Sequence, residues 1–111
     1  MTNFSKYDIV VVKFPFASSL KYKARPAVIL SSNIYNQNSR DTLLILAISS
    51  KLNNKLDFES ELIDWQTSGL LKPSIFKASI ATIEKEFAIK KLGSLSQNDI
   101  NKLENLISII C

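Results

Sequence analysis

The chain has 111 residues, enough for one domain with a modest core, and it is basic, with a formal net charge of +4. It contains no histidine and one cysteine, which excludes a Ser-His-Asp triad or a two-histidine ribonuclease mechanism and makes a zinc site implausible. Residues 1–56 carry eight Lys/Arg and two Asp/Glu, whereas residues 57–111 carry six and eight. The basic first half predicts a polyanionic partner, although a solvated, lysine-rich surface has the same composition.

No segment of the sequence has the character of a signal peptide or a membrane span. Residues 1–8 lack a basic flank and an apolar core, and the longest apolar runs, Ile9–Val12 and Leu43–Ile48, are too short to cross a bilayer. Cys111 is the only cysteine, so no internal disulfide can form. We therefore expect a soluble, cytoplasmic protein that uses no metal and no other cofactor.

The first two-thirds of the chain has the pattern of short strands. The apolar, β-branched run Asp8–Phe14 predicts a strand that ends at Pro15, and Ala24–Ser31 predicts a second, with Pro26 near its start. Thr42–Ser49 is almost continuously apolar, which predicts a strand buried on both faces.

The segments between and after these strands are more mixed. Asn33–Ser39 is polar and predicts a short irregular or helical piece, whereas Leu56–Ile63 alternates and predicts a half-exposed strand. Asp64–Gly69 could form one helical turn, with its aspartate as N-cap and its glycine just after the end. Ser74–Ser79 and Phe87–Leu92 are shorter candidate strands.

The clearest helix is expected at the C-terminus. Ser96 is a good N-cap, and Asp99 complements the positive end of the first turn. One apolar stripe of helical period follows, made of Ile100, Leu103, Leu106, Ile107 and Ile110. Short strands followed by this helix predict a mostly β (α+β) fold, a small antiparallel barrel with appended helices.

Four stretches of the sequence match, in order and spacing, those of a known family. Tyr7–Phe16 is similar to its opening strand, where Tyr7 stands at a position that is usually glycine. Ala24–Ser31 resembles its R-P-A strand after a basic loop, and Leu46–Lys51 resembles its A-I-[TS]-S strand end. The last stretch comprises Gly69–Ser74, Ala81–Ile83 and Lys90–Ser96. On these motifs the chain resembles the MazF/PemK (Kid)-like toxins of type II toxin-antitoxin systems.

This resemblance implies a fold, an activity and partners. The fold would be a small SH3-like antiparallel β-barrel with short helical insertions and a C-terminal helix, one domain over residues 1–111. The protein would form a homodimer and bind a cognate acidic antitoxin. Its activity would be that of a metal-independent, sequence-selective endoribonuclease, which cuts single-stranded RNA to 2′,3′-cyclic phosphate and 5′-hydroxyl ends and so inhibits translation and growth.

The resemblance also implies site residues. Arg25 matches the active-site arginine of the family, and Ser49 matches its active-site threonine or serine. Both suit the chemistry, because a guanidinium stays charged and can hold two phosphate oxygens, while a hydroxyl can donate to the phosphate. Around this catalytic pair we expect RNA contacts from Lys21, Tyr22, Lys23, Ser50, Lys51 and Lys77.

Other interpretations stay open at this point. The general base is not identified, because residues 76–79 hold no carboxylate where some relatives place one. A CcdB-like toxin that blocks DNA gyrase without catalysis would have the same fold. A catalytically weak module that binds RNA or an antitoxin is a further alternative. Trp65 could stack on a base, although burial in a core or a dimer interface is its more common role.

Overall fold

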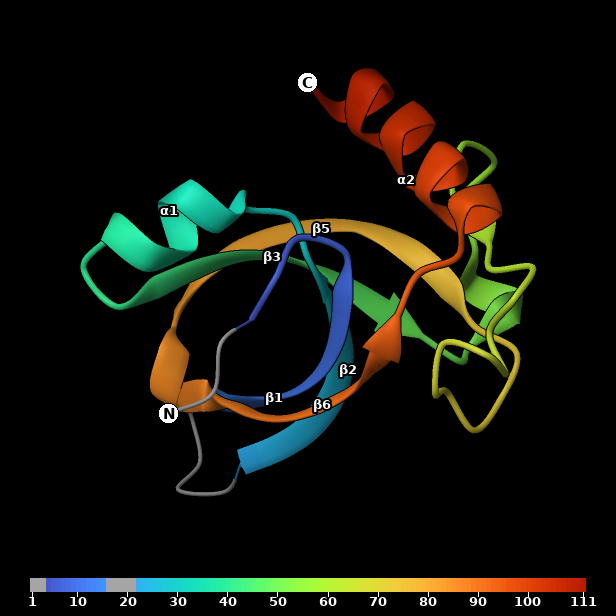
Figure 1. The fold of residues 1–111 in the computed structure, drawn as a ribbon. Helices are drawn as coiled ribbons and strands as arrows, with labels where there is room; N and C mark the ends of the chain where they lie inside the picture. Colours follow the sequence, from blue (N-terminus) through green and yellow to red (C-terminus); the bar gives the residue numbers. More distant parts are fainter. Residues whose placement is uncertain (1–3, 16–21) are drawn as a thin grey trace.

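The computed structural model describes residues 4–15 and 22–111, which form a curled sheet and two α-helices (Figure 1). The strands are β1 (Asp8–Pro15), β2 (Tyr22–Ile29), β3 (Thr42–Ser49), β4 (Ser60–Glu61), β5 (Ile75–Glu84) and β6 (Ala88–Ser94). The helices are α1 (Asn33–Asn38) and α2 (Gln97–Ile110), and single 3-10 turns lie at Leu52–Asn54 and Lys85–Phe87. Within these described ranges, no helix is long and apolar enough to cross a membrane.

The sheet has the order β4-β5-β3-β2-β1-β6, and its neighbouring strands are all antiparallel. It bends round on itself in Figure 1, but no ladder joins β4 to β6 among the described residues, so the barrel stays open. The predicted mostly β, barrel-like antiparallel fold with appended helices is therefore confirmed. β3 has the predicted bounds, and β5 runs beyond the predicted Ser79.

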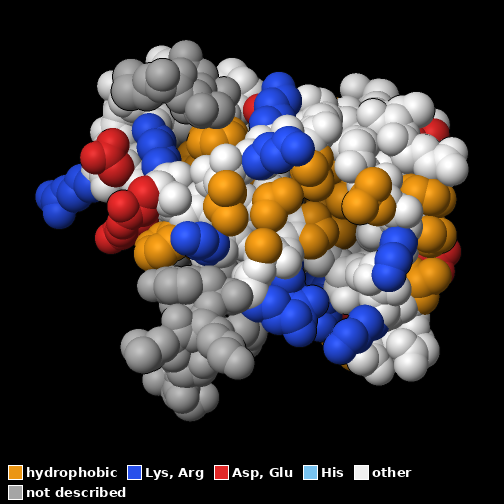
Figure 2. All heavy atoms as spheres, turned by 90° about the horizontal axis from the view of Figure 1, so that it is seen from below, with side chains coloured by type: hydrophobic (Ala, Val, Ile, Leu, Met, Phe, Trp, Pro, Cys, Tyr) orange, Lys and Arg blue, Asp and Glu red, His pale blue; other side chains and the backbone are white. Residues whose placement is uncertain are grey.

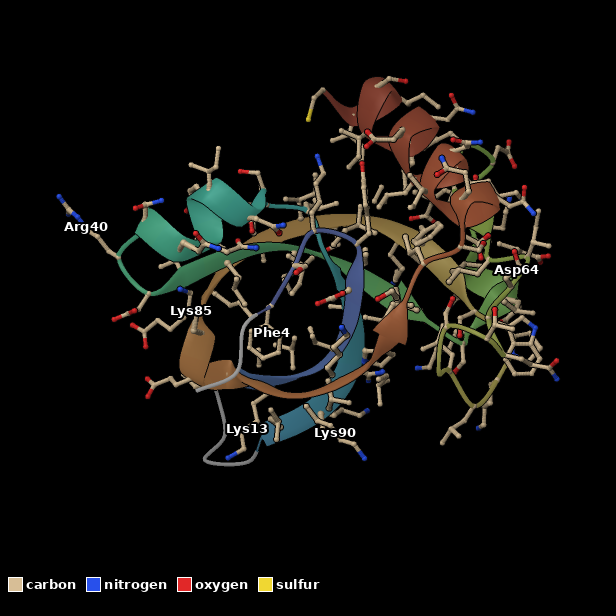
Figure 3. All side chains as sticks on the ribbon, viewed as in Figure 1. Phe4, Lys13, Arg40, Asp64, Lys85 and Lys90 are labelled. Carbon is tan, nitrogen blue, oxygen red and sulfur yellow. The ribbon has the colours of Figure 1, made fainter. Side chains whose placement is uncertain are left out.

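The sheet buries apolar side chains on both of its faces. Successive residues alternate between two clusters, so that Ile9 belongs to one and Val10 to the other. The outer cluster, beneath α2, comprises Ile9, Val28, Leu46, Ile48, Leu62, Leu70, Phe76, Leu95, Leu103 and Leu106. The inner cluster comprises Val10, Val12, Ala27, Ile29, Leu43, Ile45 and Ala88. Phe4 packs against the inner cluster, within the curve of the sheet in Figure 3. Burial on both faces explains why these strands are almost continuously apolar.

The C-terminal helix is capped and packed as the sequence predicts. Ser96 accepts a hydrogen bond from the Asp99 N–H, and Leu103 and Leu106 are buried in the outer cluster. Asp99, however, does more than complement the first turn. Its side chain is 0% exposed, and its two carboxylate oxygens accept the N–H groups of Ile63 and Asp64 at 2.7 and 2.9 Å. The start of α2 is thereby fastened to the segment before residue 65.

The predicted half-exposed strand at residues 56–63 is wrong for most of its length, because only β4 is extended there. Glu59 is 4% exposed, while Leu56 and Phe58 are 50% and 43% exposed, the reverse of the burial that an alternating, half-exposed strand predicts. The Glu59 carboxylate accepts the N–H groups of Leu56 and Ala78 at 2.8 and 2.6 Å. The first of these bonds is local and competes with strand pairing, and the second joins the loop to β5 and keeps Glu59 buried.

Tyr7 adopts an unusual backbone conformation just before β1. Its φ is +74°, in the left-handed region, which accounts for the glycine usual at this position in the family that the sequence resembles. The conformation is held from both sides, because the Tyr7 N–H donates to the Ile29 carbonyl at 2.8 Å and its carbonyl accepts from Leu95 at 3.0 Å. The hydroxyl donates to Glu104 of α2, and the ring lies 5.2 Å from Lys6 Nζ.

The Tyr7–Glu104 hydrogen bond makes the stability of the fold vary with pH in the alkaline range. The hydrogen bond to Glu104, partial burial and the charge of Glu104 raise the pKa of Tyr7 to about 12, from 10.0. Because the pKa of Tyr7 is higher in the folded than in the unfolded protein, its neutral hydroxyl stabilises the fold. This stabilisation is fully present below pH 10 and is lost as pH rises through about 12. We expect Tyr7→Phe to remove this part of the pH dependence in urea unfolding. Tyr35→Phe is the control, since the Tyr35 hydroxyl meets the uncharged Thr42 hydroxyl at 3.0 Å. Equal alkaline losses in wild type and Tyr7→Phe would contradict the assignment.

Candidate functional site

The register of two strands brings the predicted catalytic pair together. β2 and β3 pair with Ala27 opposite Ala47, two residues along the chain from Arg25 on β2 and two from Ser49 on β3. Both residues line one hollow with a volume of about 640 Å³. The fold thus places a guanidinium and a hydroxyl in the same surface hollow.

The hollow spans four strands and one irregular segment. Its lining residues come from β1, β2, β3 and the residue after it, β6, and the segment of residues 69–74. They are Val11, Ala24, Arg25, Pro26, Ile48, Ser49, Ser50, Gly69, Leu70, Leu71, Lys72, Ser74, Lys90, Lys91 and Leu92. Figure 2 shows a face on which a band of hydrophobic side chains is bordered by Lys and Arg side chains. An apolar floor with a cationic border suits a ligand that combines flat apolar groups with negative charge.

One wall of the hollow depends on the two glycines of the chain. Gly69 has a φ of +90°, and a Cβ there would lie 2.3 Å from the Leu92 carbonyl oxygen. A Cβ on Gly93 would lie 2.4 Å from the Ser68 carbonyl oxygen. The irregular segment therefore crosses β6 backbone against backbone, which only residues without a side chain permit. The predicted turn at residues 64–69 is present, but the Asp64 carboxylate accepts the Ser96 hydroxyl at 2.6 Å.

The charged side chains in the hollow are all hydrogen-bond donors. The Ser49 Oγ accepts the Lys51 N–H at 3.1 Å, which leaves its own hydrogen free to donate to a ligand. Four lining residues are cations, namely Arg25, Lys72, Lys90 and Lys91, and none of the lining residues is acidic. Those cations that no carboxylate neutralises can hold and polarise an anion, and the guanidinium is able to make two parallel bonds to it.

The structure brings only some of the predicted site residues together. Arg25, Ser49 and Ser50 all line the hollow. Lys23 and Lys51 are exposed and adjoin lining residues in sequence, while Lys77 lies half-buried on β5, outside the lining set. Tyr22 begins β2, and Lys21 lies outside the described residues. Their contacts with RNA stay predictions. Trp65 is partly buried against the outer cluster, the more common of its two expected roles.

Sequence reasoning did not select three of the cations. Lys72, Lys90 and Lys91 belong to the half of the chain with more acidic than basic residues, so the charge balance pointed elsewhere. A signal did exist, because these lysines fall within stretches that resemble the family. What was missing was the pairing of β6 with β1, which carries two of them to the hollow.

The carboxylate that was absent from residues 76–79 is supplied to that segment by Glu59. Its Oε2 accepts the Ala78 N–H at 2.6 Å, but Glu59 is buried, holds a second N–H and does not line the hollow. Its contacts are those of a residue that fixes the loop before β4 against β5. The carboxylate is therefore not positioned to take a proton from a ligand in the hollow.

Comparisons with known proteins agree on one family. Residues 5–111 match the family described as PemK-like, MazF-like toxin of type II toxin-antitoxin system. No curated protein matches the chain. A MazF from Deinococcus radiodurans has a TM-score of 0.76 at 16% identity, covering 99% of this chain and 98% of that one. The Mycobacterium tuberculosis toxin MazF-mt6 has a TM-score of 0.75 at 19% identity, covering 93% and 94%. An endoribonuclease in complex with its cognate antitoxin, from a Mycobacterial species, has a TM-score of 0.73 at 16% identity, covering 99% and 94%.

At these identities the solved structures show a shared fold. The family match is a separate finding, since it runs from before β1 to the last residue of the chain. It includes every element that lines the hollow. The chain therefore belongs to the PemK-like, MazF-like toxins of type II toxin-antitoxin systems.

Proposed function

We propose that this toxin is a metal-independent, sequence-selective endoribonuclease that cleaves single-stranded RNA and so stops translation and growth. The observation that carries the proposal is that Arg25 and Ser49 line one hollow whose charged lining residues are all cations. An apolar floor beside these groups suits nucleobases, and the cations suit the phosphate chain. Structures of similar fold are described as endoribonucleases, which supports the same activity here.

In the proposed reaction the RNA supplies its own nucleophile. The 2′-oxygen attacks the adjacent phosphorus, the bond to the 5′-oxygen breaks, and the products carry a 2′,3′-cyclic phosphate and a 5′-hydroxyl. The 2′-hydroxyl loses its proton and the leaving 5′-oxygen gains one. The protein's part is to align the attack and to stabilise the charge that develops on the phosphate oxygens.

Two residues divide this work. The Arg25 guanidinium binds the nonbridging oxygens in two places, which both orients the phosphate and stabilises its growing charge. The Ser49 hydroxyl donates to the same phosphate, because the Lys51 N–H already occupies an acceptor site on its oxygen. No lining residue is assigned as general base, since none of them is a carboxylate or histidine. Charge stabilisation is thus the main source of the proposed rate enhancement.

The proposal extends to partners. A cationic hollow has to be covered to silence the toxin, and an acidic, partly disordered antitoxin tail that folds on binding has the required charge. A related structure is described as a complex with its cognate antitoxin, which supports this partner. A homodimer is proposed as the active form, acting in the cytoplasm. The side chain of Leu71, which lines the hollow and is 94% exposed, offers apolar surface for contacts with a partner.

The test is cleavage of a long single-stranded RNA by the wild-type protein in EDTA, with end-group analysis. We expect discrete cuts that bear 2′,3′-cyclic phosphate and 5′-hydroxyl ends. The same protein should stop the growth of cells that express it without an antitoxin. Growth arrest with no RNA cleavage would refute the nuclease and favour a gyrase-blocking or binding-only toxin. Cuts that appear only when a divalent cation is added would refute metal independence.

A further inference from the structure

The cations around the hollow differ in whether their charge is already neutralised. Lys91 Nζ lies 3.4 Å from Asp8 Oδ1, and the Asp8 side chain is nearly buried. That carboxylate is fixed by two further donors, the Ser5 N–H at 2.8 Å and the Ser94 hydroxyl at 3.0 Å. A phosphate that approaches Lys91 therefore has to compete with a well-anchored carboxylate.

Lys72 and Lys90 are different. Both line the hollow, both are exposed, and neither side-chain ammonium has a hydrogen-bond or ion-pair partner in the part of the chain that the structure describes. In Figure 3 Lys90 projects away from the centre of the barrel, from the strand at the edge of the sheet. Unpaired, solvated cations at the border of a hollow release counterions when they meet phosphates. These two lysines are therefore available to bind an anion.

The sheet register places Lys90 at a defined separation from the catalytic pair. Lys90 lies opposite Val11, which in turn lies opposite Pro26, the residue after Arg25. Two strand spacings separate the Cα atoms of Lys90 and Pro26 by about 10 Å. Lys90 is thus displaced across the sheet from the phosphate that Arg25 and Ser49 would share. Lys72 approaches from the irregular segment that forms the wall.

We propose that Lys72 and Lys90 bind backbone phosphates next to the cleaved one, whereas Lys91 contributes no direct contact. This inference rests on the proposed function, because it assumes RNA in the hollow, but it concerns binding and not the cleavage step. Contacts of this kind fix the register of the strand without reading bases. Losing either lysine should weaken the binding of every RNA sequence to the same extent.

The experiment measures binding of a single-stranded RNA with 2′-O-methyl groups throughout, which cannot be cleaved, by fluorescence anisotropy from about 50 to 200 mM salt. The variants are Lys72→Gln and Lys90→Gln, and Lys91→Gln is the matched control because it removes the same charge from the same hollow. We expect the slope of log K against log salt to fall by about 0.7 in each of the first two and to stay unchanged in the control.

The outcomes separate this inference from the nuclease itself. Equal slope losses in all three variants, or no loss in Lys72→Gln and Lys90→Gln, would overturn it. The unmodified RNA is cut in parallel as a second readout. If wild type cleaves RNA but the slopes do not change as expected, the phosphate contacts are refuted and the nuclease is not. If the slopes change as expected but no RNA is cleaved, the phosphate contacts are supported and only the nuclease is refuted.

Discussion

Replacing Arg25 by alanine is expected to lower kcat/KM for RNA cleavage by about 10³-fold, which corresponds to about 4 kcal/mol of transition-state stabilisation. The reason is that Arg25 is the lining cation on β2, the neighbour of the strand that carries Ser49, while the other lining cations come from β6 and the wall segment. Because the Arg25 side chain is only partly buried, its loss should leave the thermal unfolding midpoint almost unchanged. Single-turnover cleavage of one defined RNA measures the effect.

Lysine at the same position separates charge from geometry. Arg25→Lys keeps a positive charge but cannot make two parallel bonds to a phosphate, so we expect it to regain only about tenfold of the loss. Arg40→Ala is the charge-matched control, since Arg40 is exposed and lies beyond α1, apart from the lining residues (Figure 3). A drop in Arg40→Ala equal to that in Arg25→Ala would mean that net charge, and not this site, sets the rate.

The parts of the fold that could be predicted are those specified by local pattern. β1, β3 and α2 were located because an apolar run or a helical stripe needs no knowledge of distant residues. The strand predicted at residues 56–63 was wrong because Glu59 accepts a hydrogen bond from the backbone of Ala78. The alternation of side chains does not predict this contact. Tyr7 is a similar case, since its left-handed backbone is held by Ile29 and Leu95 from other elements.

The site shows the same division. Arg25, Ser49 and Ser50 were found through sequence motifs on two strands that are also neighbours in the sheet. Lys90 reaches the hollow through the pairing of β6 with β1, two strands that are far apart in the chain. Long-range pairing is set by the whole core and not by the residues around a lysine. For this reason the second set of cations became visible only in three dimensions.

Substitution of a glycine where residues 69–74 cross β6 has the largest expected effect on stability. Gly69→Ala should lower the free energy of unfolding by about 3 kcal/mol or more, which for a chain of this size lowers the Tm by about 12 °C. Two causes add: a left-handed φ of +90°, and a Cβ that would lie 2.3 Å from the Leu92 carbonyl oxygen. That oxygen belongs to the backbone of β6, so it cannot turn aside as a flexible side chain would.

A second pair of variants separates these causes. In Gly93→Ala the new Cβ would lie 2.4 Å from the Ser68 carbonyl oxygen, but the φ of residue 93 is not left-handed. We therefore expect the overlap alone to lower the free energy of unfolding by about 2 kcal/mol. Gly69→Asn tests the backbone, because asparagine adopts left-handed conformations more readily than alanine. If overlap with β6 dominates, asparagine regains almost none of the loss, whereas recovery of about half would assign the cost to φ.

The matched control is Gln66→Ala, an exposed position in the same turn, which should change the Tm by no more than about 2 °C. Because residues 69–74 form the wall of the hollow, partial displacement of this segment should weaken RNA binding before the protein unfolds. Calorimetry and RNA anisotropy on the same samples would show this order. Full RNA affinity in a Gly69→Ala protein that has lost stability would mean that the crossing supports the fold but does not shape the site.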